Sequence, residues 1–233
     1  MKFLYTGILK DVTDFLYPRV CIVSENSLSE ENSNRFISDE ILSNLTRVTK
    51  KQSEELKNKL KADYVYSHYD FPQKSDFEKI IHHLKYTGMK SLGNFLGEHL
   101  AGYAKLELDE INEKFDFIIP VPLHKTKVRE RGYNQSEFIA KGVSDRLNIT
   151  LLTNTISRTR YTKSQTKLNL IQRAENMKDA FKVNEANSEL LKNKNIILLD
   201  DVITTGATVN ECISVLKNAG VNKIFALSLA MAE

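Results

Sequence analysis

The chain has few of the residues and segments that mark secreted or membrane proteins. Its 233 residues include only two cysteines, Cys21 and Cys212, which lie far apart in the sequence. This number argues against a disulfide framework and against a zinc site built from several thiolates. No apolar run approaches the length of a membrane span, and Lys10, Asp11 and Asp14 interrupt the apolar residues near the start. We therefore expect a protein of the reducing cytoplasm without membrane insertion.

An excess of charge of one sign is also missing. The formal net charge of +3 is too small to predict nucleic-acid binding by itself. Hydrophobic residues make up 41% of the chain and charged residues 27%, which is typical of a globular protein and excludes disorder throughout. A chain of this length can build one substantial core and a smaller satellite unit.

The sequence divides into a polar amino-terminal part and a longer part with regular hydrophobic patterns. Because residues 24–58 are rich in Ser, Asn, Glu and Lys, we predict a small unit at 1–62 and a larger domain at 63–233. Strand patterns in the larger domain alternate with helical patterns. The strands are expected at 63–71, 115–121, 149–155, 180–183, 195–201 and 223–229, and the helices at 77–84, 89–106, 133–147 and 207–218. This alternation predicts an α/β fold with a mostly parallel sheet and flanking helices.

The most informative segment is 196–208, in which an apolar run is followed by two acids and a Thr-rich loop. The continuous run from Ile196 to Leu199 predicts a buried parallel strand, and open α/β sheets bind ligands at the carboxyl ends of such strands. Asp200 and Asp201 would lie at that end. The loop then leads into a helix whose first backbone amides can point at an anion. Its residues are Thr204, Thr205, Gly206, Ala207 and Thr208.

A phosphate loop beside two carboxylates predicts a ligand with both a phosphate and a group that carboxylates bind. A ribose 5-phosphate fits, because carboxylates accept hydrogen bonds from its paired hydroxyls. The segment resembles the phosphoribosyl pyrophosphate (PRPP) motif of type I phosphoribosyltransferases. A buried strand with a Thr-rich helix cap is the alternative. The order of apolar run, Asp pair, Thr-Thr-Gly and helix favours the ligand site.

A second candidate anion site lies between the strand at 115–121 and the helix at 133–147. Four cations and one acid occupy this basic turn. Arginine offers phosphate a planar pair of donors and lysine offers a point charge. Lys125, Arg129 and Arg131 are therefore candidate contacts for pyrophosphate. A solvated basic loop remains the alternative.

A third basic segment runs from Ser157 to Asn176 and has no acid before Glu175. A cationic loop with little apolar content can close over a polyanion, so this segment is a candidate lid. A surface loop that aids solubility, or one that touches nucleic-acid phosphates, is the alternative.

Taken together, these segments resemble the ComF family of phosphoribosyltransferase-like proteins, some of which are associated with natural competence and DNA uptake. The matching residues occur in order and cover roughly 65–233. They are Arg131-Gly-Tyr-Asn-Gln135, then Arg160, Gln165, Leu168, Arg173, Asn176 and Ala180-Phe181, then Leu199-Asp-Asp-Val-Ile-Thr-Thr-Gly206. The resemblance implies displacement at the anomeric carbon of PRPP, with Mg²⁺ bridging pyrophosphate and ribose.

In that scheme Asp200 and Asp201 hold the ribose diol, directly or through metal-bound water, and Arg160, Gln165 and Arg173 close the lid. The resemblance leaves two functions open. One is a phosphoribosyltransferase with an unknown acceptor. The other is a non-catalytic PRPP- or nucleotide-binding adaptor whose partners are single-stranded DNA and a DNA-uptake helicase or recombination proteins.

The amino-terminal part departs from the family pattern, which has a zinc knuckle with two Cys-x-x-Cys pairs. The corresponding frame here is Cys21, Ser24, Ser38 and Ile41, so only one thiolate ligand remains. Serine and isoleucine do not replace thiolates at a tetrahedral zinc site, so we expect no structural zinc. Cys21 and Cys212 are expected to be core residues instead.

Overall fold

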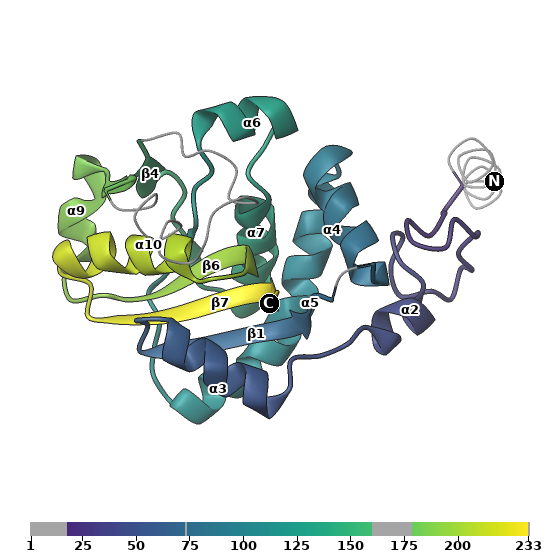
Figure 1. The fold of residues 1–233 in the computed structure, drawn as a ribbon, viewed down its shortest axis with the longest axis horizontal. Helices are drawn as coiled ribbons and strands as arrows, with labels where there is room; N and C mark the ends of the chain where they lie inside the picture. Colours follow the sequence, from purple (N-terminus) through teal and green to yellow (C-terminus); the bar gives the residue numbers. More distant parts are fainter. Residues whose placement is uncertain (1–17, 73, 160–178, 233) are drawn as a thin grey trace, which may run out of the picture.

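A parallel sheet forms the centre of the molecule. The computed structural model describes residues 18–72, 74–159 and 179–232 (Figure 1). Within them, the main sheet has five strands in the order β1-β7-β6-β2-β3, and all neighbouring pairs are parallel. The strands are β1 (Tyr64–Asp70), β2 (Phe117–Pro120), β3 (Thr150–Leu151), β6 (Asn195–Ile203) and β7 (Lys223–Met231). The predicted α/β class with a mostly parallel sheet is confirmed.

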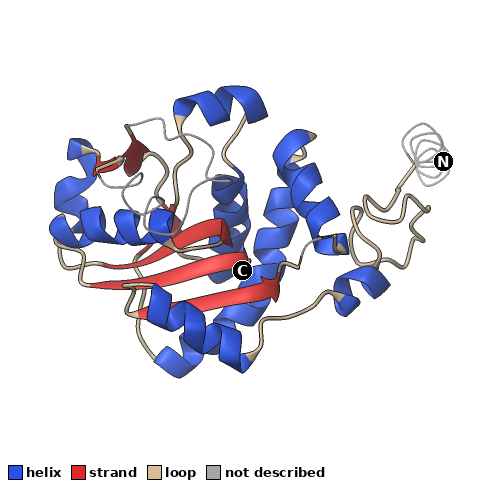
Figure 2. Ribbon diagram, in the orientation of Figure 1, coloured by secondary structure: helices blue, strands red, loops and turns tan. Residues whose placement is uncertain are grey.

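Helices cover both faces of this sheet (Figure 2). One core holds side chains of α4 (Asp76–Tyr86), α5 (Lys90–Ile111) and α7 (Gln135–Leu147). The other holds side chains of α3 (Lys50–Lys59), α9 (Glu185–Leu191) and α10 (Ala207–Asn218). In β6, Ile197 and Leu199 enter the first core while Ile196 and Leu198 enter the second. Because successive strand residues point to opposite faces, burial on both faces explains the continuous apolar run.

Helices α5 and α7 are in backbone contact. A Cβ atom added to Gly97 would lie 2.0 Å from the Ile139 carbonyl oxygen, and one added to Gly142 would lie 2.0 Å from the Asn94 carbonyl oxygen. Since no side chain larger than hydrogen fits there, the two helices approach more closely than side chains otherwise allow. This contact fixes where α7 begins, beside the carboxyl end of the sheet.

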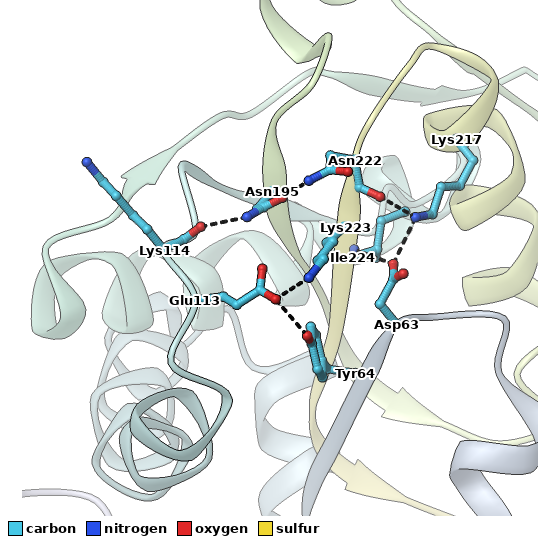
Figure 3. Close-up of polar contacts among 9 residues, drawn as sticks. All are labelled: Asp63, Tyr64, Glu113, Lys114, Asn195, Lys217, Asn222, Lys223 and Ile224. Atoms are coloured by element: carbon cyan, nitrogen blue, oxygen red, sulfur yellow. Dashed lines mark hydrogen bonds and ion pairs between the residues drawn. The ribbon is translucent and has the colours of Figure 1, made fainter.

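A polar network lies at the amino ends of β1 and β7, at the end of the sheet away from the carboxyl ends of the strands (Figure 3). The Asp63 carboxylate lies 2.8 Å from Lys217 Nζ of α10. The Glu113 carboxylate accepts a 3.0 Å hydrogen bond from the Tyr64 hydroxyl and also binds Lys223. These contacts connect the starts of the two strands to α10 and to the segment after α5. The network lies away from the carboxyl end of β6.

The sequence placed most elements of the sheet domain, and α10 has the predicted bounds. The prediction of a turn without a helix between β2 and α7 was wrong, because this segment contains helix α6 (Lys125–Arg131). The His124 side chain accepts a hydrogen bond from the Thr126 amide at its start, and Gly132 with φ +82° ends it. The strand expected at 149–155 is also shorter, and β4 (Ile156–Arg158) pairs with β5 (Phe181–Val183) in a separate antiparallel ribbon.

The amino-terminal segment joins the cores through a few buried side chains. Cys21 and Cys212 are both buried, as expected. Cys21 Sγ accepts a hydrogen bond from the Ser38 amide at 3.4 Å, and the Ser38 side chain caps α2 (Asp39–Asn44). Helix α3 packs on β1 and places Leu56 in the second core, while the division of the chain at residue 62 stays a prediction.

The described part of the chain contains neither a candidate membrane helix nor a candidate metal cluster. None of its helices combines the length and the hydropathy that a membrane crossing requires. Across residues 18–72, 74–159 and 179–232, no three His, Cys, Asp or Glu side chains gather in a way that could hold a metal ion.

Candidate functional site

The two acids lie side by side near the carboxyl end of β6, which continues to Ile203. Asp200 Oδ1 accepts hydrogen bonds from Ser136 Oγ at 3.0 Å and from the Asp201 amide at 2.9 Å. Asp201 Oδ2 lies 3.5 Å from Lys85 Nζ. Ser136 belongs to the first turn of α7 and Lys85 to the last turn of α4. The acidic pair is thus held by side chains from two different helices.

The two carboxyls have pKa values shifted in opposite directions. Burial and the neighbouring Asp201 carboxylate raise the pKa of Asp200. Burial also acts to raise the pKa of Asp201, but the Lys85 ammonium, the Val202 amide and the Arg131 guanidinium outweigh it, so that pKa is lowered. In the free protein Asp201 therefore carries the negative charge more firmly than Asp200 does.

The loop at 204–208 follows directly and shares a small recess with Asp200. Gly206 is the N-cap of α10 and has φ +75°, a left-handed conformation that glycine adopts without strain. Its carbonyl oxygen accepts a hydrogen bond from the Asn210 amide at 2.8 Å, which closes the first turn of the helix. The first amides of α10 therefore lie beside the recess, and the start of a helix attracts anions.

The end of α3 supports this loop from below, which the sequence did not predict. The Asn210 side chain donates to the Lys59 carbonyl and accepts from the Lys61 amide, both at 2.8 Å. Buried Leu60 packs so closely that a Cβ atom on Gly206 would lie 2.6 Å from its Cδ2. The spacing of Leu56 and Leu60, one helical turn apart, could have predicted a helix packed on the core. The polar residues around them made this pattern weak.

Of the three candidate pyrophosphate residues, only Arg131 acts on the acidic pair. Helix α6 follows β2, which pairs with β6 next to the acidic pair. The positive charge of Arg131 reaches the acidic pair, because it lowers the pKa of Asp201. Arg131 Nη1 also donates a hydrogen bond to Gln135 Oε1 at 2.9 Å. Lys125 and Arg129 are exposed on α6.

The candidate lid residues Arg160, Gln165 and Arg173 lie outside the described residues. The two flanks of their segment are joined, because β4 pairs with β5 and the Thr159 amide donates to the Ala180 carbonyl at 2.8 Å. The lid role stays a prediction.

Comparisons with known proteins match the same part of the chain. Residues 128–231 match the phosphoribosyl transferase domain family. The chain is 38% identical over 115 residues to "Competence protein F" of Haemophilus influenzae, which is 49% of this chain and 50% of that protein. It is 31% identical over 149 residues to "DNA utilization protein YhgH" of Escherichia coli O157:H7, covering 60% and 61%. The chain thus spans about half to three-fifths of the length of these curated relatives.

Comparison with solved structures gives weaker similarities. The glutamine PRPP amidotransferase from B. subtilis, complexed with ADP and GMP, is 17% identical with a TM-score of 0.37, covering 58% of this chain and 25% of that chain. A hypoxanthine phosphoribosyltransferase from Staphylococcus aureus is 11% identical with a TM-score of 0.35, covering 59% and 64%.

The parallel sheet, the acidic pair before the loop, and the match of residues 128–231 are those of a type I phosphoribosyltransferase-like fold. The similarity to these curated relatives agrees with the resemblance to the ComF family.

Proposed function

We propose that this chain binds PRPP at the acidic pair and transfers its phosphoribosyl group to an acceptor. The observation that carries the proposal is the position of Asp200 and Asp201 next to the loop at 204–208, with which Asp200 shares a recess. Carboxylates accept hydrogen bonds from the ribose hydroxyls, while amides at the start of α10 bind the 5-phosphate. The site thus provides partners for both ends of a ribose 5-phosphate.

The residues around the acidic pair fit Mg²⁺ as an ion brought largely by the substrate. Mg²⁺ keeps several waters and usually binds one or two carboxylates together with substrate phosphates. Asp200 and Asp201 would supply the carboxylates. When bound, the ion neutralises charge on the departing pyrophosphate.

The remaining roles belong to cations of the chain. Arg131, with Lys125 and Arg129, would bind the pyrophosphate as it leaves the anomeric carbon. Arg160, Gln165 and Arg173 would exclude water. Positioning and electrostatic stabilisation then provide most of the catalysis, because charge develops on both the ribose and the leaving group.

Calorimetry with PRPP and Mg²⁺ tests the binding step. Replacing both acids, Asp200→Asn with Asp201→Asn, removes charge-assisted hydrogen bonds that are each worth about 1.5 to 3 kcal/mol. We expect affinity to fall by on the order of a hundredfold or more. Asp145→Asn is the matched control, since its exposed carboxylate lies at the far end of α7. Wild-type affinity in the double variant would refute the assignment.

Pyrophosphate release tests the transfer step. The purified protein is incubated with PRPP, Mg²⁺ and a panel of nucleobases and amines. Release that depends on one acceptor supports a transferase. PRPP binding without release for any acceptor favours the adaptor function.

A second candidate function is a cytoplasmic adaptor in DNA uptake. The names of the curated relatives favour it, and so do the two basic segments of the sequence. Its partners would be single-stranded DNA and a DNA-uptake helicase or recombination proteins. Binding of single-stranded DNA that weakens steeply with salt supports this function, because phosphate contacts release counterions. Absence of such binding at low salt argues against it.

A further inference from the structure

Three successive residues at the carboxyl end of α4 each contact a residue of the candidate site. The contacts are the Tyr133 hydroxyl donating to the Leu84 carbonyl, Lys85 Nζ at 3.5 Å from Asp201 Oδ2, and the Tyr86 ring centre at 5.7 Å from Arg131 Cζ. Arg131 is the last residue of α6 and Tyr133 follows that helix, whereas Asp201 belongs to β6. The last turn of α4 therefore contacts both the acidic pair on β6 and the basic segment around α6.

The contact between Lys85 and Asp201 differs from the other ion pairs of the described residues. Its side chains are only 22% and 15% exposed, the lowest values among those pairs. The Lys51 to Glu55 pair, for comparison, is 86% and 40% exposed. Surface pairs contribute little because water and salt screen them, whereas a partly buried pair keeps more of its attraction.

The position of Lys85 on α4 makes this contact durable. Lysine is favourable in the last turn of a helix, where the macrodipole is negative. The hydrogen bond from Tyr133 to the preceding residue, Leu84, holds the helix end against the site. Lys85 therefore presents its ammonium to Asp201 without moving the backbone.

An ammonium at this place changes how the acidic pair meets a divalent cation. Two adjacent carboxylates attract Mg²⁺, but a cation already paired with Asp201 competes with it. We propose that Lys85 is a tethered counter-ion of the acidic pair: it neutralises Asp201 in the free protein, so that Mg²⁺ enters the site together with PRPP and not before it. This inference rests on the proposed function, because PRPP is the ligand that brings the metal.

The test measures binding of Mn²⁺ alone to the free protein by electron paramagnetic resonance, since Mn²⁺ favours the same oxygen ligands as Mg²⁺. We expect Lys85→Met to bind Mn²⁺ roughly tenfold more tightly than the wild type. Lys85→Arg keeps the charge and should resemble the wild type. Lys79→Met is the matched control, because Lys79 lies on the same helix in an exposed pair with Asp76.

A double variant assigns the effect to the pair itself. Adding Asp201→Asn to Lys85→Met should abolish the gain in Mn²⁺ affinity, because the carboxylate for which Lys85 and the metal compete is gone. Circular dichroism verifies folding, and Lys85→Gln replaces Lys85→Met if the latter unfolds. An Mn²⁺ affinity within about twofold of wild type in the folded variant overturns the inference.

Failure of the inference is distinguishable from failure of the proposed function. Calorimetry of the wild type with PRPP and Mg²⁺ reports the proposed function alone. If PRPP binds and Lys85→Met leaves Mn²⁺ affinity unchanged, only the counter-ion role is refuted. Tight Mn²⁺ binding by the free wild type also refutes it.

Discussion

Replacement of Asn210 by alanine is the sharpest test of how the fold supports the phosphate loop. Asn210 joins α10 to the end of α3 by two hydrogen bonds of 2.8 Å, to the Lys59 carbonyl and from the Lys61 amide. Each such bond contributes about 0.5 to 1 kcal/mol at a partly exposed site. We expect the free energy of unfolding to fall by about 1 to 2 kcal/mol.

The same variant should also weaken ligand binding, because Leu60 presses against Gly206 and the loop loses its support when the end of α3 moves away. A reorganisation cost of about 1 kcal/mol corresponds to roughly fivefold weaker binding of ribose 5-phosphate. Pyrophosphate affinity should not change, since α6 is untouched. Isothermal calorimetry with each ligand separates the two effects.

Asn222→Ala is the matched control for Asn210→Ala. Its side-chain amide donates to Asn195 Oδ1 at 2.9 Å at the opposite edge of the sheet (Figure 3). We expect a modest loss of stability and unchanged affinity for ribose 5-phosphate. If Asn210→Ala loses stability but binds ribose 5-phosphate like the wild type, α3 supports the fold and not the loop, and the reasoning fails.

Three further predictions concern stability. Gly142→Ala should lower the free energy of unfolding by about 3 kcal/mol or more in urea titrations, because its Cβ atom would lie 2.0 Å from the Asn94 carbonyl oxygen. Burial, with His99 and Arg47, lowers the pKa of His68 to about 3, so His68 stays neutral in the folded state while the unfolded chain takes up a proton below its ordinary pKa of 6.5. Stability should therefore fall by about 2 kcal/mol between pH 7.5 and 5.0 from this residue, and His68→Gln should show a smaller fall. Asp63→Asn should cost about 1 kcal/mol or less by thermal unfolding, since the pair with Lys217 is a third exposed.

The sequence could predict those parts of the site whose residues are neighbours along the chain. The run from Ile196 to Leu199, the two acids and the loop share one stretch of chain, so their order alone indicates strand, carboxyl end and helix start. Lys85 is 116 residues from Asp201, and only the packing of α4 on the sheet brings them together. Sequence periodicity reports which face of a helix is buried but not which carboxylate its last turn meets.

The basic turn shows a different limit. The sequence predicted a turn with an anion site there and no helix, because no apolar stripe marks one. The helix forms because His124 and Gly132 satisfy its two ends, so that seven residues need little burial to be ordered. Capping residues were present in the sequence, but a single short helix is a weaker pattern than an amphipathic one.

The ribbon formed by β4 and β5 has a consequence for engineering. Because the Thr159 amide bonds to the Ala180 carbonyl, the chain leaves and re-enters this ribbon at nearly the same point. A short turn could therefore join Thr159 to Ala180 at little entropic cost. Exchanging the sequence between these two residues for that of a relative should then leave the pairing of β4 with β5 in place.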